Sequence, residues 1–165
     1  MTTSSATVID PQLEAAFSAI AADPAVAGAL QKLKTDEPAT LEEQKRITEI
    51  PSPTFGEARR AQHYLARMKD LGLADVSINA EGNVIGLRQG AGRKPKLVVS
   101  AHLDTVFAAG TDVTVREKDG ALYAPGIGDD GRGLAALLAV LRALNAANLR
   151  TVGDIMFVGT VGEEG

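Results

Sequence analysis

The run Leu97-Val-Val-Ser-Ala-His-Leu-Asp104 is the most informative segment of the sequence, because a nearly all-apolar stretch leads directly into a polar triplet. A short apolar run of this kind is typical of a strand that is covered on both faces of a sheet. Ile155-Met-Phe-Val-Gly-Thr-Val161 has the same character and is also followed by polar residues. We therefore predict two fully buried strands, each with candidate functional residues at its carboxyl end.

The segments around these two strands alternate between helical and strand periodicity. Residues 11–34 predict two helices with a break near Asp23, where Asp-Pro is a typical helix start. Capping-box patterns, Thr40-Leu-Glu-Glu43 and Thr54 with Glu57, predict two more helices, one ending before Pro51 and one running to about Leu71. Leu134–Leu144 predicts an apolar helix, and half-buried strands are expected at 76–80, 84–88 and 113–117.

This order of elements predicts an α/β layer architecture. The last apolar strand, 155–161, has no following helix within the 165 residues, so one face or edge of the sheet is expected to lack cover. We interpret the chain as a fragment of a longer fold. Residues 1–39 are expected to form a helical extension, and residues 40–165 to form the first part of the main domain.

Composition excludes several function classes. The net charge is −4, from 17 basic and 21 acidic residues, and this argues against nucleic-acid binding. No apolar run approaches the roughly 18 residues of a membrane span. The chain has 0 cysteines, which excludes disulfides and thiolate chemistry. The opening Met1-Thr-Thr-Ser-Ser-Ala-Thr-Val8 lacks the pattern of a signal peptide, so a cytoplasmic location is expected.

Candidate metal ligands follow both apolar strands. His102 and Asp104 come after the first strand, where open α/β sheets bind ligands, and a carboxylate can orient a zinc-binding imidazole. Glu163 and Glu164 come after the second strand. Two adjacent carboxylates repel each other unless a cation lies near them, and they allow one to bind metal while the other acts as a general base. Alone, each pattern is also compatible with an ordinary hydrogen-bonded loop.

A third polar group, Gly126-Ile-Gly-Asp-Asp-Gly131, precedes the apolar helix. As text it matches the glycine-rich turn of dinucleotide-binding proteins, so a nucleotide-binding module is one alternative. The two aspartates would place negative charge where the pyrophosphate lies, and no buried strand precedes the turn. A cation suits Asp129 and Asp130 better, because a carboxylate before a helix start can bridge metal ions.

Together, three segments are similar to a known family: Ser100–Val106, Tyr123–Gly131 and Gly159–Gly165, with Ile50-Pro-Ser-Pro-Thr54 resembling its early loop. The family comprises the co-catalytic di-zinc metallopeptidases that include peptidase T, glutamate carboxypeptidase, aminoacylase, acetylornithine deacetylase and succinyl-diaminopimelate desuccinylase. The resemblance covers roughly residues 40–165. It implies a three-layer α/β/α zinc-peptidase catalytic domain, incomplete here, with the second domain, a lid or dimerisation domain, absent.

The resemblance also implies a role for each candidate residue. His102 and Glu164 would each ligate one of two divalent ions, and Asp129 would bridge them on a peptide bond that is often cis. Asp104 would orient His102, and Glu163 would be the general base that deprotonates the bridging water. The ions are expected to be Zn²⁺, with Co²⁺ or Mn²⁺ as alternatives. Residues Phe107 and Gly131-Arg132 depart from the pattern of many members.

The implied function is a metal-dependent amide hydrolase that acts on small peptides or N-acyl amino acids, with a homodimer expected for a full-length form. The family's remaining metal ligands lie after the segment that corresponds to Gly165, so these residues alone predict weak metal binding and little turnover. The alternative is a non-catalytic truncated remnant that folds or associates without turnover.

Overall fold

The computed structural model describes residues 10–165, so the opening segment that we compared with signal peptides lies outside the described residues. Four helices come first: α1 (Pro11–Ala22), α2 (Pro24–Thr35), α3 (Glu37–Thr48) and α4 (Ala58–Asp70). The following elements are β1 (Ala74–Ile78), β2 (Val84–Arg88), β3 (Leu97–His102), β4 (Arg116–Lys118), β5 (Ala121–Tyr123), α5 (Gly131–Ala146) and β6 (Ile155–Thr160).

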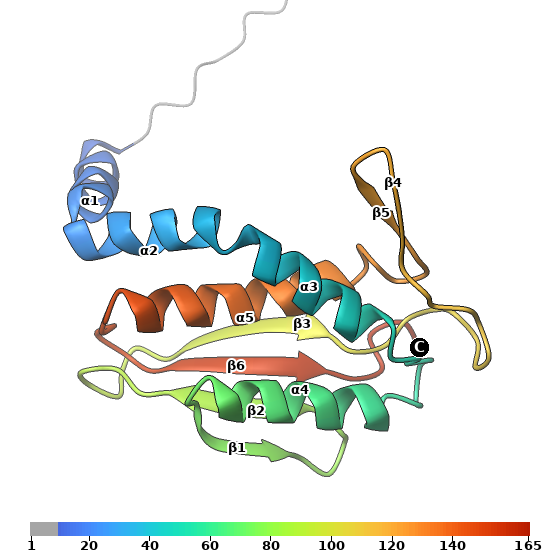
Figure 1. Ribbon diagram of the computed structural model, residues 1–165. Helices are drawn as coiled ribbons and strands as arrows, with labels where there is room; N and C mark the ends of the chain where they lie inside the picture. Colours follow the sequence, from blue (N-terminus) through green and yellow to red (C-terminus); the bar gives the residue numbers. More distant parts are fainter. Residues whose placement is uncertain (1–9) are drawn as a thin grey trace, which may run out of the picture.

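The main sheet is mixed and has the strand order β1-β2-β6-β3. β3 pairs parallel with β6. On the other side of β6, β2 pairs antiparallel with β6, and β1 in turn pairs antiparallel with β2. Figure 1 shows the arrowheads of β3 and β6 pointing toward the same end of the sheet, near the C-terminus. The residues that follow these two strands therefore meet at one edge.

One face of the sheet carries the core. Phe157 belongs to a cluster that includes Tyr64 and Met68 of α4 with Leu134 and Leu138 of α5. The packing is close, because the phenol of Tyr64 donates to the main-chain oxygen of Leu134 over 3.1 Å. The fold is thus α/β, as predicted, with helices packed against this face.

The opposite face of the sheet lies outside that core cluster. By register, Val98 is paired with Met156, and Ile85 with Val158, and these side chains alternate with the core-facing ones. Val98 is 56% exposed. The described residues therefore supply two of the three expected layers, so the domain is incomplete, as expected.

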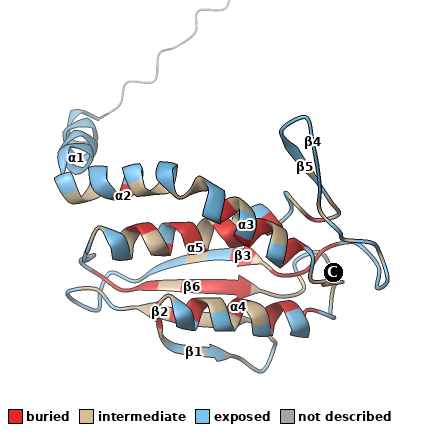
Figure 2. Ribbon diagram, in the orientation of Figure 1, coloured by how far each residue is buried: buried red, intermediate tan, exposed pale blue. Residues whose placement is uncertain are grey.

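β3 corrects one expectation. We predicted that this strand is covered on both faces, but it lies at the sheet edge, and within it only Ala101 is buried. β6 is the central strand and is largely buried, as predicted. Figure 2 shows this contrast between the two neighbouring strands. Apolar composition identified both strands but could not distinguish the edge from the centre.

The two capping boxes are also wrong. α3 begins at Glu37, so Thr40 lies inside the helix, where its hydroxyl donates to the main-chain oxygen of Asp36. Glu57 precedes α4, but its carboxylate accepts from Phe55 N rather than from a helix start. The helices themselves exist, because their apolar periodicity is independent of how the first turn is capped.

Most of the other predicted elements fit with small changes. α1 and α2 break at Asp23, whose carboxylate accepts from the first N–H groups of α2. The strand expected at 113–117 is wrong in position and burial: β4 begins only at Arg116, is exposed at all of its positions, and pairs with β5 in a short hairpin that projects from the main body in Figure 1. The division into 1–39 and 40–165 stays a prediction, and residue 40 lies within α3. Within residues 10–165 no single helix is long and apolar enough to cross a membrane; only α1 and α2 taken together have that length and composition, and they are bent by 69° relative to each other.

Candidate metal centre

His102 ends β3 with its ring at the carboxyl edge of the sheet. Nδ1 lies 3.1 Å from the main-chain oxygen of Asp104 and 3.5 Å from the carboxylate of the same residue. Nε2 lies 2.9 Å from Oδ1 of Asp129. Since Nδ1 is occupied by Asp104, Nε2 is the nitrogen available to a metal, and it faces the carboxylate that would share the ion.

Carboxylates surround this imidazole and raise its pKa. Burial lowers the pKa of His102, but the hydrogen bond with Asp129 and the negative charges of Asp130, Asp104 and Glu163 outweigh burial. Such a convergence of negative charge around one ring favours a bound cation.

Asp104 is fully buried and organises the turn after β6. Its two carboxylate oxygens accept the main-chain N–H groups of Glu163, over 3.2 Å, and Glu164, over 2.9 Å. Burial raises the pKa of Asp104, but these backbone hydrogen bonds and the nearby His102 lower it below the usual range. Asp104 is therefore ionised at neutral pH and connects the histidine segment to the glutamate segment.

The Asp129-Asp130 pair precedes α5, and the peptide bond between the two residues is cis, as the resemblance implies. The side chain of Asp129 is 82% exposed and contacts His102. Asp130 points the other way: Oδ1 accepts from Gly133 N at the start of α5, and Oδ2 accepts from His102 N over 3.1 Å. This carboxylate occupies the helix start where a pyrophosphate would bind, which supports the rejection of the dinucleotide-binding alternative.

Glu163 and Glu164 meet His102 at the sheet edge. Each of the three residues offers one ligand atom, and these atoms all lie within 4.8 Å of one another. Asp129 adjoins this group through its contact with His102. One imidazole with several carboxylates is a donor set that fits Zn²⁺ and related divalent ions, so the residues present fit the implied metal.

Arg60 is a supporting residue that the sequence did not indicate. It is 1% exposed, and its guanidinium donates to the main-chain oxygens of Thr48, Ile50 and Leu103. Burial lowers the pKa of Arg60 to about 10, against the opposing charge of Asp104. Its position on α4 gave no signal, because arginine at a helical position usually faces solvent.

Asp130 is a second residue whose role the sequence left open. The start of α5 explained one aspartate as an N-cap, and Asp130 is that residue. Its additional hydrogen bond to His102 joins two segments that are 28 residues apart. Only the tertiary structure brings these partners together.

Comparisons with known proteins show which family and which relatives this chain is similar to. Residues 98–165 match the family described as peptidase family M20/M25/M40. A putative [LysW]-lysine/[LysW]-ornithine hydrolase of Thermococcus kodakarensis is 31% identical over 73% of this chain and 31% of its own length. Carboxypeptidase G2 of Pseudomonas sp. is 29% identical over 81% of this chain and 34% of its own.

Solved structures give the same result. A tripeptidase from Staphylococcus aureus superposes with a TM-score of 0.66 at 32% identity, over 78% of this chain and 37% of that one. The chain spans about a third of the length of the curated relatives it matches. The segment that matches peptidase family M20/M25/M40, residues 98–165, contains His102, Asp129 and the glutamate pair, so this part of the chain is similar to that family at all three candidate motifs.

Proposed function

We propose that this chain is the N-terminal part of a metal-dependent amide hydrolase. One observation carries the proposal: ligand atoms of His102, Glu163 and Glu164 lie within 4.8 Å of one another, beside Asp129. In this assignment His102, Asp129 and Glu164 would hold two divalent ions, and Zn²⁺ is the ion that best suits this set of ligands. When bound, the ions would polarise the scissile carbonyl and promote ionisation of water.

The residues of the chain supply the proton transfers. The carboxylate of Glu163 is exposed, so it can reach a substrate, and its main-chain N–H is fixed by Asp104. Glu163 accepts a proton as the water oxygen bonds to the carbonyl carbon, and it delivers that proton to the amine when the C–N bond breaks. Asp104 is a positioning residue, because it holds both the imidazole and the glutamate turn.

Small peptides or N-acyl amino acids are the proposed substrates. Support comes from the relatives reported above, which include a carboxypeptidase and a tripeptidase. Homodimerisation, a cytoplasmic location and the absence of nucleic-acid or membrane partners stay predictions.

Glu163→Gln tests the assignment in the longest natural protein that contains these residues. The variant is expected to lose turnover by roughly 10²–10⁴-fold, because glutamine cannot accept the proton. Bound metal, measured by elemental analysis, should stay unchanged. Glu117→Gln, on the exposed β4–β5 hairpin, is the matched control and should keep full activity. Turnover that survives Glu163→Gln contradicts the role of Glu163.

The alternative of a non-catalytic remnant is favoured by one observation, the exposed apolar surface at Leu97 and Val98. Hydrolysis of a dipeptide or an N-acyl amino acid by the natural protein would exclude this alternative. A protein that binds no divalent ion and hydrolyses no amide would support it.

A further inference from the structure

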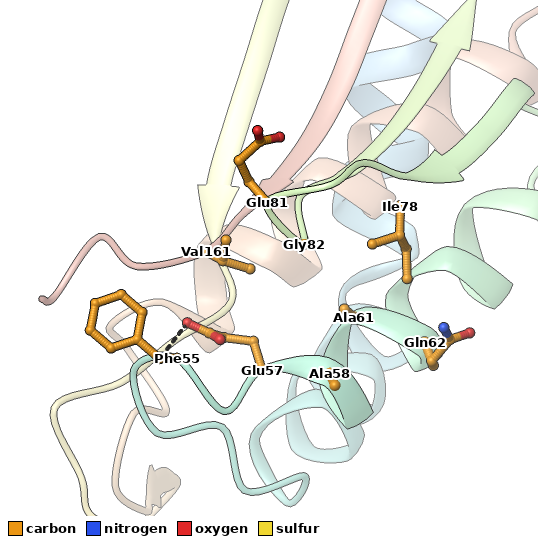
Figure 3. Close-up of a pocket in the computed structure, with 9 residues that line it drawn as sticks. All are labelled: Phe55, Glu57, Ala58, Ala61, Gln62, Ile78, Glu81, Gly82 and Val161. Atoms are coloured by element: carbon orange, nitrogen blue, oxygen red, sulfur yellow. Dashed lines mark hydrogen bonds between the residues drawn. The ribbon is translucent and has the colours of Figure 1, made fainter.

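A cavity of about 280 Å³ opens at the same edge of the sheet as the candidate metal centre. It lies between the first turns of α4, the turn that joins β1 to β2, and the residue that follows β6 (Figure 3). Its lining is largely apolar, with contributions from Phe55, Ala58, Ala61, Ile78 and Val161. Apolar cavities at the carboxyl edge of an α/β sheet are common ligand sites.

The wall of this cavity is hydrogen-bonded to the turn after β6 that carries Glu163 and Glu164. Oε1 of Glu57 accepts from Phe55 N over 2.9 Å and from Gly162 N over 3.1 Å. The ring of Phe55 packs against both glycines that flank the glutamate pair: an added Cβ would meet it at 3.3 Å from Gly162 and at 2.9 Å from Gly165. A group bound in the cavity would therefore lie next to the turn that presents Glu163.

Phe55 has an unfavourable backbone conformation, and its side chain is not part of the hydrophobic core. Its φ is +64°, which is unfavourable for an aromatic residue, and its side chain is 83% exposed. Burial of the ring therefore does not offset the strain of the backbone. Strained residues that persist in this way cluster at ligand-binding sites.

We propose that the cavity is a substrate subsite for an uncharged apolar group beside the scissile amide, with Phe55 as its specificity-determining wall. This inference rests on the proposed function. Among the described residues that line the cavity none is a lysine or arginine, while Glu57 lies beside Phe55 and Glu81 lies at the rim (Figure 3). The site therefore disfavours an acidic group and accepts a side chain such as that of leucine.

Matched substrates test the subsite in the longest natural protein that contains these residues. Dipeptides with leucine, glycine or aspartate beside the scissile amide are compared by kcat/KM. Leucine is expected to exceed glycine by at least about tenfold, and aspartate to fall below glycine. Equal values for leucine and glycine, or a preference for aspartate, would overturn the proposal.

Ala58→Trp fills the cavity from the exposed surface of α4. The variant is expected to lose the preference for leucine over glycine, because the indole ring occupies the cavity. Ala66→Trp, also exposed on α4 but outside the cavity, is the matched control and should keep the preference. If Ala58→Trp lowers leucine and glycine turnover equally, the cavity is not a subsite.

A binding measurement separates this inference from the proposed function. N-acetyl-leucinamide, titrated into the protein without added metal, should shift the amide NMR signals of Gly82 and Val161, whereas N-acetyl-aspartate should not. Ala58→Trp should abolish the shifts. Shifts without hydrolysis of any substrate would support the cavity and contradict the proposed function. Hydrolysis without shifts would overturn the cavity alone.

Discussion

Asp104 connects two segments of the candidate centre although it is not itself assigned to a metal. Its carboxylate is buried and ionised, and it accepts two main-chain N–H groups from the glutamate turn. A single side chain thereby fixes the relative position of His102 and Glu164. The sequence placed Asp104 beside His102, but the contact with the glutamates requires two strands to lie side by side.

Asp104→Asn is expected to lower the free energy of unfolding by roughly 2–4 kcal/mol. The asparagine side chain has one uncharged oxygen, so it cannot replace the two carboxylate oxygens that accept from Glu163 N and Glu164 N. Zn²⁺ affinity should fall about 10–100-fold as the ligands lose their orientation. Urea unfolding and titration calorimetry measure the two effects. Asp112→Asn changes an exposed acceptor of Thr114 N and should leave both the free energy of unfolding and the Zn²⁺ affinity unchanged. Unchanged stability and affinity in Asp104→Asn would contradict this role.

At the scale of elements, α3 and α4 are joined by a buried carboxylate. Arg67 donates to both oxygens of Glu43, over 3.0 and 3.1 Å from Nε, and His63 Nε2 lies 3.7 Å from Glu43. Burial raises the pKa of Glu43, but the neighbouring His63 and Arg67 outweigh it and lower the pKa to about 2. Glu43, which the sequence predicted as part of a capping box for α3, instead joins α3 to α4.

This depressed pKa predicts a pH-dependent stability. In the folded state Glu43 titrates near 2, against about 4.5 when unfolded, so its contribution is present above the unfolded value and is lost as the pH falls toward 2. At pH 7, Glu43→Gln should therefore cost about 3 kcal/mol, and the difference should shrink steadily below pH 4.5. Urea unfolding at several pH values measures this, with the exposed Glu42→Gln as control. A cost that is independent of pH would show that packing, not charge, dominates.

At the scale of the whole molecule, the helices within residues 10–165 cover one face of the sheet and leave the other without a helical layer. β3 forms an edge, with Leu97 and Val98 exposed, while the core lies on the side of α4 and α5. Exposed apolar edge strands are common sites of association.

We expect Val98→Lys to weaken concentration-dependent self-association of the chain, because a charge on an edge strand opposes pairing. Sedimentation velocity over a range of concentrations measures this. Val152→Lys, in an exposed loop, is the control and should leave association unchanged. The stability of both variants should stay within about 0.5 kcal/mol. Equal association in the two variants would locate the contact elsewhere.

Features that depend on neighbouring residues could be predicted from the amino-acid sequence. Periodicity identified the helices and the two apolar strands, and Asp23 was recognised as a helix start because its partners are the next few N–H groups. The candidate ligands were found for the same reason, since each follows an apolar strand or precedes a helix. The order of motifs then indicated the family.

Features that depend on partners far apart in the chain could be recognised only in the folded structure. Apolar composition is the same for a central and an edge strand, so the exposure of Val98 followed from the edge position of β3 together with the face of the sheet on which Val98 lies. Arg60 and Glu43 are buried because partners elsewhere in the chain, the carbonyl oxygen of Leu103 and the side chain of Arg67, satisfy their charges. Burial of a charge needs such partners, and no local pattern specifies them.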